Sequence, residues 1–138
     1  MATIGEGLEH AETIRAASGG APTMVLVAAG SYVEDLIVTG NVSLIGGYDP
    51  TSWSLRDPAI FTTTIKNTKG EGLKLIGTEL PMLLDGFSIQ GRTVVSGTGP
   101  SIAVTIDGGE PILSGNVITS GPHKEGPGAR CGVRVITE

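Results

Sequence analysis

The chain has 138 residues, of which 39% are hydrophobic, and a formal net charge of −5. This length is that of one domain with its own core. The net charge is negative and the sequence has no stripe of basic residues, which argues against nucleic acid as a partner. No run of about 18 apolar residues is present, which excludes a membrane-spanning helix.

The first predicted element is an amphipathic helix over about residues 3–18. Thr3 is placed to cap its N-terminus, and Glu6 completes a capping box three residues later. Gly19 and Gly20 supply the stop. The apolar stripe at helical spacing consists of Ile4, Leu8, Ala11 and Ile14. No basic segment followed by an apolar core precedes the helix, so we expect no signal peptide in this chain.

Short apolar runs separated by glycine and proline follow, and none has helical periodicity. They predict strands at Met24–Ala28, Leu36–Val38, Val42–Ile45 and Phe61–Ile65, then near 73–76, 82–84, 86–89, 93–95, 102–106, 111–113, 116–118 and 132–136. We expect a turn over 46–50 and a loop over 51–60.

An imperfect repeat of about 30 residues organises these strands. Gly72–Ile76 returns as Ile102–Ile106 and as Gly132–Ile136, and Leu84–Ile89 returns as Leu113–Ile118. Two phrases recurring at nearly one period, without crossover helices, predict a coil whose parallel strands stack about 4.8 Å apart over about five turns. A hairpin-built sandwich is the competing fold. It would place Asp-Gly turns at hairpin centres rather than in the repeat frame.

The first strand and the region after it are similar to known proteins. Val25–Glu34, directly after an amphipathic helix, resembles the opening turn of right-handed parallel β-helix proteins of the pectate-lyase-like group. Val42–Pro50, followed by Trp53 and Arg56-Asp57, is similar to a phrase of bacterial exported β-helix repeat proteins.

This resemblance covers nearly the whole chain. It implies an all-β fold, a right-handed single-stranded parallel β-helix of about five turns capped by the N-terminal helix. The length and the repeat predict one domain over residues 1–138, with coils over about 23–138, either as a whole protein or as a fragment of a longer chain. The resemblance further implies a secreted or cell-surface location.

Lyases of this group use carboxylates that bind calcium together with an arginine or lysine base. The residues of these types are Asp85, Asp107, Glu110, Arg92 and Arg134. In the repeat frame Asp85 aligns with Ser114, whereas Asp107 aligns with Gly77 and Thr137, so the two acids occupy different columns. We interpret both as turn residues that bond local backbone.

Other catalytic patterns are weaker. The hydrolase signatures Asn-Thr-Asp, Gly-His-Gly and Arg-x-Lys do not occur in the chain. His123 and Cys131 lie in a polar loop without a third partner, and Glu6 with His10 reads as a solvated helix face. Asn116 is expected to bond neighbouring turns. We therefore predict no catalytic residue, no metal and no cofactor.

The candidate ligand-binding residues are Tyr48, Trp53, Arg56 and Asp57. An exposed aromatic ring is a good platform for a sugar ring. The alternative is that Trp53 covers a gap beside the loop while Arg56 and Asp57 brace it.

The sequence favours a non-catalytic structural or binding module of an exported bacterial β-helix protein, with a glycan or a protein as ligand. One alternative is a fragment of a carbohydrate-active enzyme, a polysaccharide lyase or a glycoside hydrolase. Another is an end-to-end assembly module, because no cap follows Ile136 and the last strand leaves unpaired backbone groups. Either a longer natural chain or a second copy would cover that end.

Overall fold

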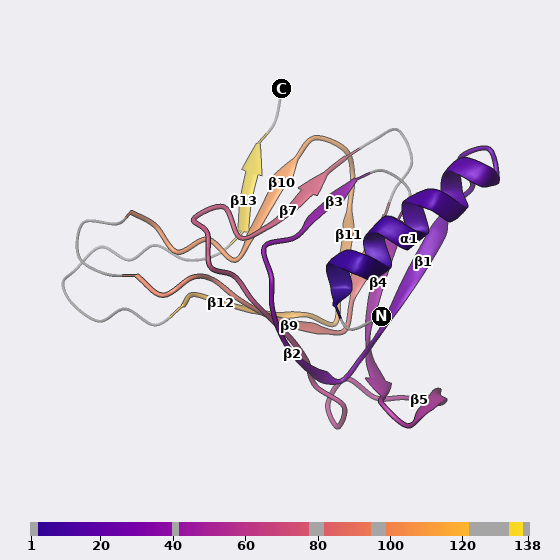
Figure 1. Ribbon diagram of the computed structural model, residues 1–138. Helices are drawn as coiled ribbons and strands as arrows, with labels where there is room; N and C mark the ends of the chain where they lie inside the picture. The colour runs from indigo at the N-terminus through magenta and orange to yellow at the C-terminus, as the bar shows by residue number, and fades with distance from the viewer. Residues whose placement is uncertain (1–2, 40–41, 78–81, 95–98, 122–132, 137–138) are drawn as a thin grey trace.

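The computed structural model describes residues 3–39, 42–77, 82–94, 99–121 and 133–136. Within these ranges the chain forms an N-terminal helix followed by short β-strands, nearly all of which pair in parallel (Figure 1).

Helix α1 (Ile4–Ala17) begins where the sequence predicts it. The Thr3 hydroxyl accepts a hydrogen bond from the Glu6 N–H at 3.1 Å, which confirms the N-cap. At the other end Gly20 donates to the Arg15 carbonyl at 2.8 Å. The helix buries Ile4, Gly7, Leu8 and Ala11. Ile14 is 45% exposed, so the predicted apolar stripe is one turn too long.

Three sheets hold the strands. Sheet A has the order β1 (Thr23–Ala28), β4 (Val42–Asp49), β8 (Leu83–Asp85) and β11 (Ile112–Ser114), and β5 (Ser52–Arg56) pairs antiparallel with β4. Sheet B has the order β2 (Gly30–Val33), β6 (Thr63–Lys66), β9 (Phe87–Gln90) and β12 (Val117–Thr119). Sheet C has the order β3 (Ile37–Thr39), β7 (Leu73–Ile76), β10 (Val104–Asp107) and β13 (Val133–Ile136).

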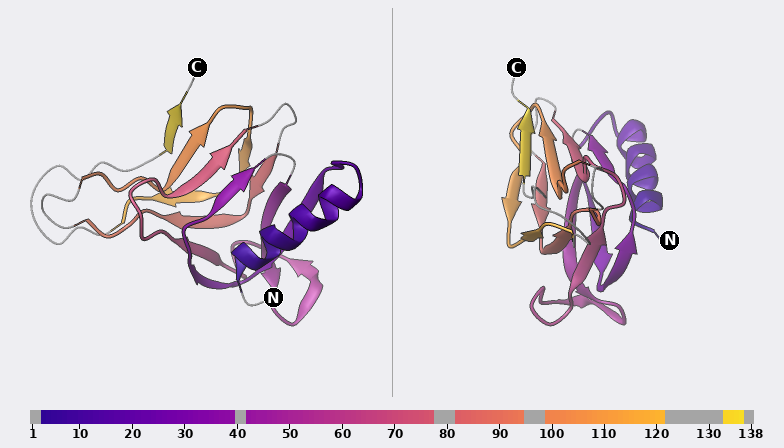
Figure 2. Two further views of the ribbon diagram at one scale, coloured as in Figure 1. Left: turned by 45° about the horizontal axis from the view of Figure 1, so that its top comes forward. Right: turned by 90° about the vertical axis from the view of Figure 1, so that its left-hand side faces the viewer.

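The chain visits sheets A, B and C in the same order on each pass, and each strand lies beside its counterpart from the pass before. Helix α1 lies at the first end of this stack and β13 at the other (Figure 2). The three sheets remain separate ladders and do not close on one another. The predicted β-rich fold with parallel sheets and an N-terminal helix is confirmed.

Aliphatic side chains from successive passes form the core. Leu44 lies opposite Leu84 in sheet A, and Ile65 lies opposite Ile89 in sheet B, all four fully buried. Burying one such side chain contributes about 1.5–3 kcal/mol. Phe87 fills the corner beside Gly46, where an added Cβ would lie 3.1 Å from the ring.

Polar side chains also join successive passes. The Asn116 amide accepts from the Phe87 N–H at 3.0 Å and donates to the Leu84 carbonyl at 2.8 Å. The prediction that Asn116 bonds a neighbouring turn is confirmed. The Thr63 hydroxyl similarly bonds Gly47 and Ala28.

The register of the repeat is confirmed for one phrase and corrected for the other. Leu84 lies opposite Leu113 and Ile89 opposite Ile118, as predicted. In sheet C, however, Val104 rather than Ala103 lies opposite Leu73.

The predicted alignment of the middle copy is therefore wrong by one residue. Asp107 lies opposite Ile76 and Ile136, and not opposite Gly77 and Thr137. The observed register places Ile106 beside Leu75 at the core. A shift of one residue would turn every side chain of the strand to the other face.

Four local predictions need correction. The predicted turn at 46–50 instead continues β4 as far as Asp49, and the predicted loop over 51–60 contains β5. The Asp49 carboxylate accepts from the Thr51 N–H at 2.8 Å, which closes the tight turn between these strands. Strand β2 was not predicted, and the strand predicted at 93–95 is reduced to an isolated bridge at Val94 in its described part.

Candidate functional site

The first strand of sheet A is apolar on both faces. Val27 of β1 is buried, whereas Met24 and Leu26 on the opposite face are 64% and 41% exposed. Such a continuous apolar run is typical of a strand covered on both sides. Strand β1 pairs with β4, and no strand in the described part of the chain pairs with its second edge.

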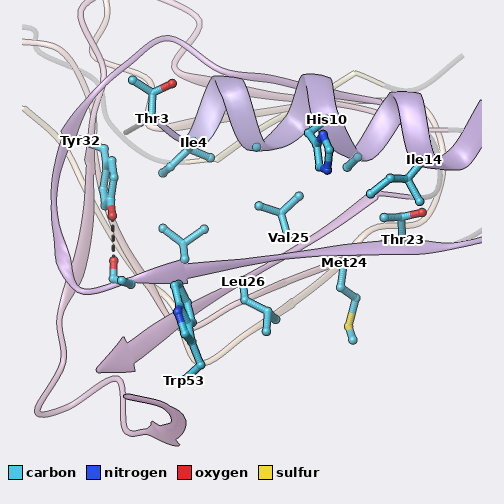
Figure 3. A pocket seen from close by; sticks show the side chains of 14 residues that line it. Thr3, Ile4, His10, Ile14, Thr23, Met24, Val25, Leu26, Tyr32 and Trp53 are labelled. Carbon is cyan, nitrogen blue, oxygen red and sulfur yellow. Dashed lines mark hydrogen bonds between the residues drawn. The ribbon is translucent and has the colours of Figure 1, made fainter. Parts of the chain in front are cut away.

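Helix α1 runs along β1 and leaves a groove of about 350 Å³ between them (Figure 3). We call this cavity the α1–β1 groove. It is lined by Thr3, Ile4, Gly7, His10, Ala11 and Ile14 of the helix region, by Thr23–Ala28, and by Tyr32 and Trp53. Most of these side chains are apolar, so the groove suits an apolar ligand group.

The two walls lie close together at one point and diverge elsewhere. A Cβ at Gly7 would lie 3.0 Å from the Val25 side chain, so this glycine permits the close approach. Val25 points between strand and helix, and His10 and Ile14 project from the helix wall (Figure 3). Met24, Leu26 and Trp53 lie on the other side of the strand (Figure 3).

Tyr32 bounds one end of the groove. Its hydroxyl donates to the Ala28 carbonyl at 3.0 Å (Figure 3). Burial, with a smaller contribution from the charge of Glu34, raises the pKa of Tyr32 above its usual value. The phenol therefore stays neutral and serves as a fixed donor.

Glu34, which follows β2, fixes the helix wall to the strands. Its carboxylate accepts from the N–H groups of Ile4 and Gly5 at 2.8 and 3.0 Å. These are unpaired donors at the positive end of the helix, where a carboxylate is favoured. The groove is thus held between two anchored elements.

The structure brings three of the four predicted ligand-binding residues together. The rings of Tyr48 and Trp53 are 5.7 Å apart with an angle of 48° between their planes. The Arg56 guanidinium carbon lies 5.8 Å from the centre of the Tyr48 ring. Trp53 is 55% exposed and also lines the α1–β1 groove.

The polar groups of Arg56 and Asp57 bind within the protein. Arg56 donates to the Gly46 carbonyl at 2.8 Å and forms an ion pair with Asp85 at 3.2 Å. The Asp57 carboxylate accepts from the Ala59 N–H at 3.0 Å. Both residues therefore brace the β4–β5 hairpin, and Trp53 is the member of the predicted set that offers the most free surface.

The acid and base candidates are dispersed. Asp85 lies in sheet A and Asp107 in sheet C, and Glu110 is exposed after β10. Arg92 donates to the Pro100 carbonyl at 3.1 Å. Among the described residues no group of three His, Cys, Asp or Glu side chains is arranged to hold a metal. His123, Cys131 and the Arg134 side chain lie outside the described part.

One feature of the sequence indicates the groove. The run Met24–Ala28 is apolar on the outer as well as the inner face of the strand that it predicts. An apolar outer face on a strand at the edge of a sheet indicates a contact surface. The groove itself also depends on the path of α1, which no local pattern predicts.

No family model, curated protein or solved structure matched the chain in the three comparisons made. The likeness to β-helix repeat proteins therefore rests on sequence segments such as Val25–Glu34 and Val42–Pro50. None of the helices in the described ranges has the length and apolar character needed to cross a bilayer.

Proposed function

We propose that the chain is the capped end of a right-handed parallel β-helix that acts as a non-catalytic binding module of an exported protein. The repeated A–B–C order of the sheets supports a single coil. Parallel crossovers are right-handed in nearly all proteins, which supports the handedness. The exported location rests on the resemblance of the sequence to surface β-helix proteins.

The observation that carries the binding role is the α1–β1 groove with Trp53 at its border. The groove is continuous with the exposed apolar side chains of Met24 and Leu26. This apolar surface lies on a chain whose net charge is negative. Exposed apolar surface of this kind marks interaction sites in monomeric proteins.

The described polar residues support binding better than catalysis. Asp85 is used in an ion pair with Arg56, and Asp35 is used to bond the backbone of Thr68 and Lys69. A catalytic pair would instead require two titratable groups that face a common cavity. The enzyme alternative predicts unsaturated products from acidic polysaccharides in the presence of calcium, and the binding module predicts none.

The ligand enters the groove, and Trp53 reports its presence, because this is the single tryptophan of the chain. We expect the neutral apolar dye N-phenylnaphthylamine to bind saturably and to accept excitation energy from Trp53. Replacing Leu26 with Asp should weaken this binding by roughly tenfold or more, because the bound dye would cover a carboxylate that is solvated in the free protein.

Val33→Asp is the matched control, since Val33 is 64% exposed on β2 and lies outside the groove. It should leave dye binding unchanged. Absence of dye binding by the folded protein, or equal binding by Leu26→Asp, would contradict the proposed site.

The second candidate function is end-to-end assembly, and the far end of the stack favours it. Leu113 and Ile118 face the core but are only partly buried, whereas Leu84 and Ile89 one pass earlier are fully buried. A second copy stacked there would cover them. Assembly predicts a mass that rises with concentration in light scattering and returns to the monomer value in Val117→Lys. A monomer mass at high concentration would contradict it.

A further inference from the structure

We propose that the α1–β1 groove binds an extended segment of another protein that pairs with the free edge of β1, places apolar side chains in the groove and carries lysine or arginine beside them. This inference rests on the proposed binding function and specifies its ligand. The mode is strand addition to an exposed sheet edge.

The backbone of β1 supplies the first part of the argument. Its second edge has no strand partner among the described residues, so alternate N–H and C=O groups on this edge have no ladder partner there, and the residues that carry them line the groove. The Ala28 carbonyl already accepts from Tyr32 and Thr63, which limits the free edge to Thr23–Val27. Five strand residues span roughly 16 Å, enough for a short extended segment.

The surroundings distinguish β1 from the other first-pass edges. Strands β2 and β3 have four and three residues, against six in β1. The cavity of about 300 Å³ between α1 and β3 is lined by the acids Glu9, Glu12 and Asp35. The α1–β1 groove is lined instead mostly by apolar side chains, and no carboxylate is among its described lining residues. Its polar members are Thr3, His10, Thr23 and Tyr32. It therefore suits alternating apolar residues of a strand.

Charge indicates what flanks those residues. Residues 1–49 contain six carboxylates (Glu6, Glu9, Glu12, Glu34, Asp35 and Asp49) and one basic residue, Arg15, which gives −5. Residues 50–138 contain eight acidic and eight basic residues, which gives zero. The whole net charge thus belongs to the part of the chain that forms α1 and β1–β4. Glu9, Glu12 and Asp35 line the α1–β3 cavity and none of the six lines the groove, so this field acts beyond the apolar wall, where basic flanks on the ligand complement it.

The test uses the full chain and a synthetic peptide, KKVTVTVKK, followed by Trp53 emission at low salt. We expect saturable binding that is roughly tenfold tighter than that of EEVTVTVEE and that weakens as salt rises. Methylating alternate backbone nitrogens of the peptide should weaken binding by a similar factor, because the edge hydrogen bonds are lost. Met24→Ser should weaken it, whereas Ile37→Ser on β3, with a similarly exposed side chain, should not.

The outcomes separate the inference from the function on which it rests. If the dye binds and the lysine-flanked peptide does not, or if the methylated or glutamate-flanked peptides bind equally well, the strand-addition inference fails and the binding module stands. If neither dye nor peptide binds, both fail. A dimer without peptide that Met24→Ser dissociates would mean that a second copy occupies the edge, and this would also overturn the inference.

Discussion

Two adjacent carboxylates, Glu34 and Asp35, hold the first pass of the chain in place. Glu34 bonds the N-terminus of α1, and Asp35 bonds the backbone of Thr68 and Lys69 in the next pass. Neither residue lies in a strand, and each satisfies backbone N–H groups that would otherwise lack partners. The groove depends on both, because Glu34 anchors its helix wall and Asp35 anchors the first strands to the segment at Thr68 and Lys69.

Glu34→Ala should reduce the free energy of unfolding by about 1–2 kcal/mol, because two helix N–H groups lose a charged acceptor. Urea denaturation measures this change. Glu9→Ala removes an exposed carboxylate from the same helix and should change stability by less than about 0.5 kcal/mol. Equal effects of the two substitutions would show that Glu34 is not an anchor.

Asp35 should make stability depend on pH. Burial alone would raise the pKa of Asp35, but hydrogen bonds from the Thr68 side chain and from the Thr68 and Lys69 N–H groups, with the charge of Lys69, hold it below the usual 3.8. As pH falls, Asp35 is therefore protonated in the unfolded chain before it is protonated in the folded protein. The contribution of Asp35 to the free energy of unfolding is complete above pH 3.8 and is lost as pH falls through the folded pKa.

Asp35→Asn should accordingly flatten the acid limb of the stability curve, measured by denaturant titration between neutral pH and about pH 2. Asp107→Asn, which alters a carboxylate for which no such set of bonds is seen, serves as the control. An unchanged acid limb in Asp35→Asn would contradict the assignment.

The strands show how far the sequence could predict the fold. The helix and its N-cap followed from local spacing, and the pairing of Leu84–Ile89 with Leu113–Ile118 followed from the repeat. The pairing in sheet C was missed by one residue, because Ile102–Ile106 contains a single polar residue, Thr105, and does not alternate clearly. Strand β5 was missed because its pairing depends on a tight turn at Asp49.

The candidate site could be predicted only in part from the sequence. The proximity of Tyr48, Trp53 and Arg56 follows from their clustering in the sequence between 48 and 56, and their role in ligand binding stays a prediction. The α1–β1 groove could not be predicted from the sequence, because it forms between two elements whose relative placement comes from tertiary packing.

Substitution of Gly72 measures how closely successive passes of the chain pack against each other. Its φ of 67° favours glycine, and an added Cβ would collide with the backbone of Ile102 and Ala103. Gly72→Ala should therefore destabilise by more than the roughly 1–2 kcal/mol cost of left-handed backbone alone.

Gly108→Ala isolates that backbone cost, because Gly108 has a φ of 73° and nothing within 4 Å of an added Cβ. The difference between the two variants in thermal or urea unfolding is the contribution of the contact between passes. Equal losses would mean that the passes are not packed as closely here as the structure indicates.

The molecule as a whole has two unlike ends. The first end is covered by α1, carries the net negative charge and contains the α1–β1 groove. The other end exposes the last described strands of sheets A and B, with partly buried Leu113 and Ile118. Ligand binding at the first end and self-assembly at the other are compatible. The two proposals involve different strands: the peptide pairs with β1, whereas a second copy would cover β11 and β12.

Hydrogen–deuterium exchange of the full chain with and without the lysine-flanked peptide tests the central claim directly. The account predicts slower exchange at the backbone N–H groups of Met24–Val27 and in the adjoining turns of α1, with β11 and β12 unchanged. Protection confined to Ile112–Ser114 and Val117–Thr119, or no protection of β1 at a saturating peptide concentration, would contradict it.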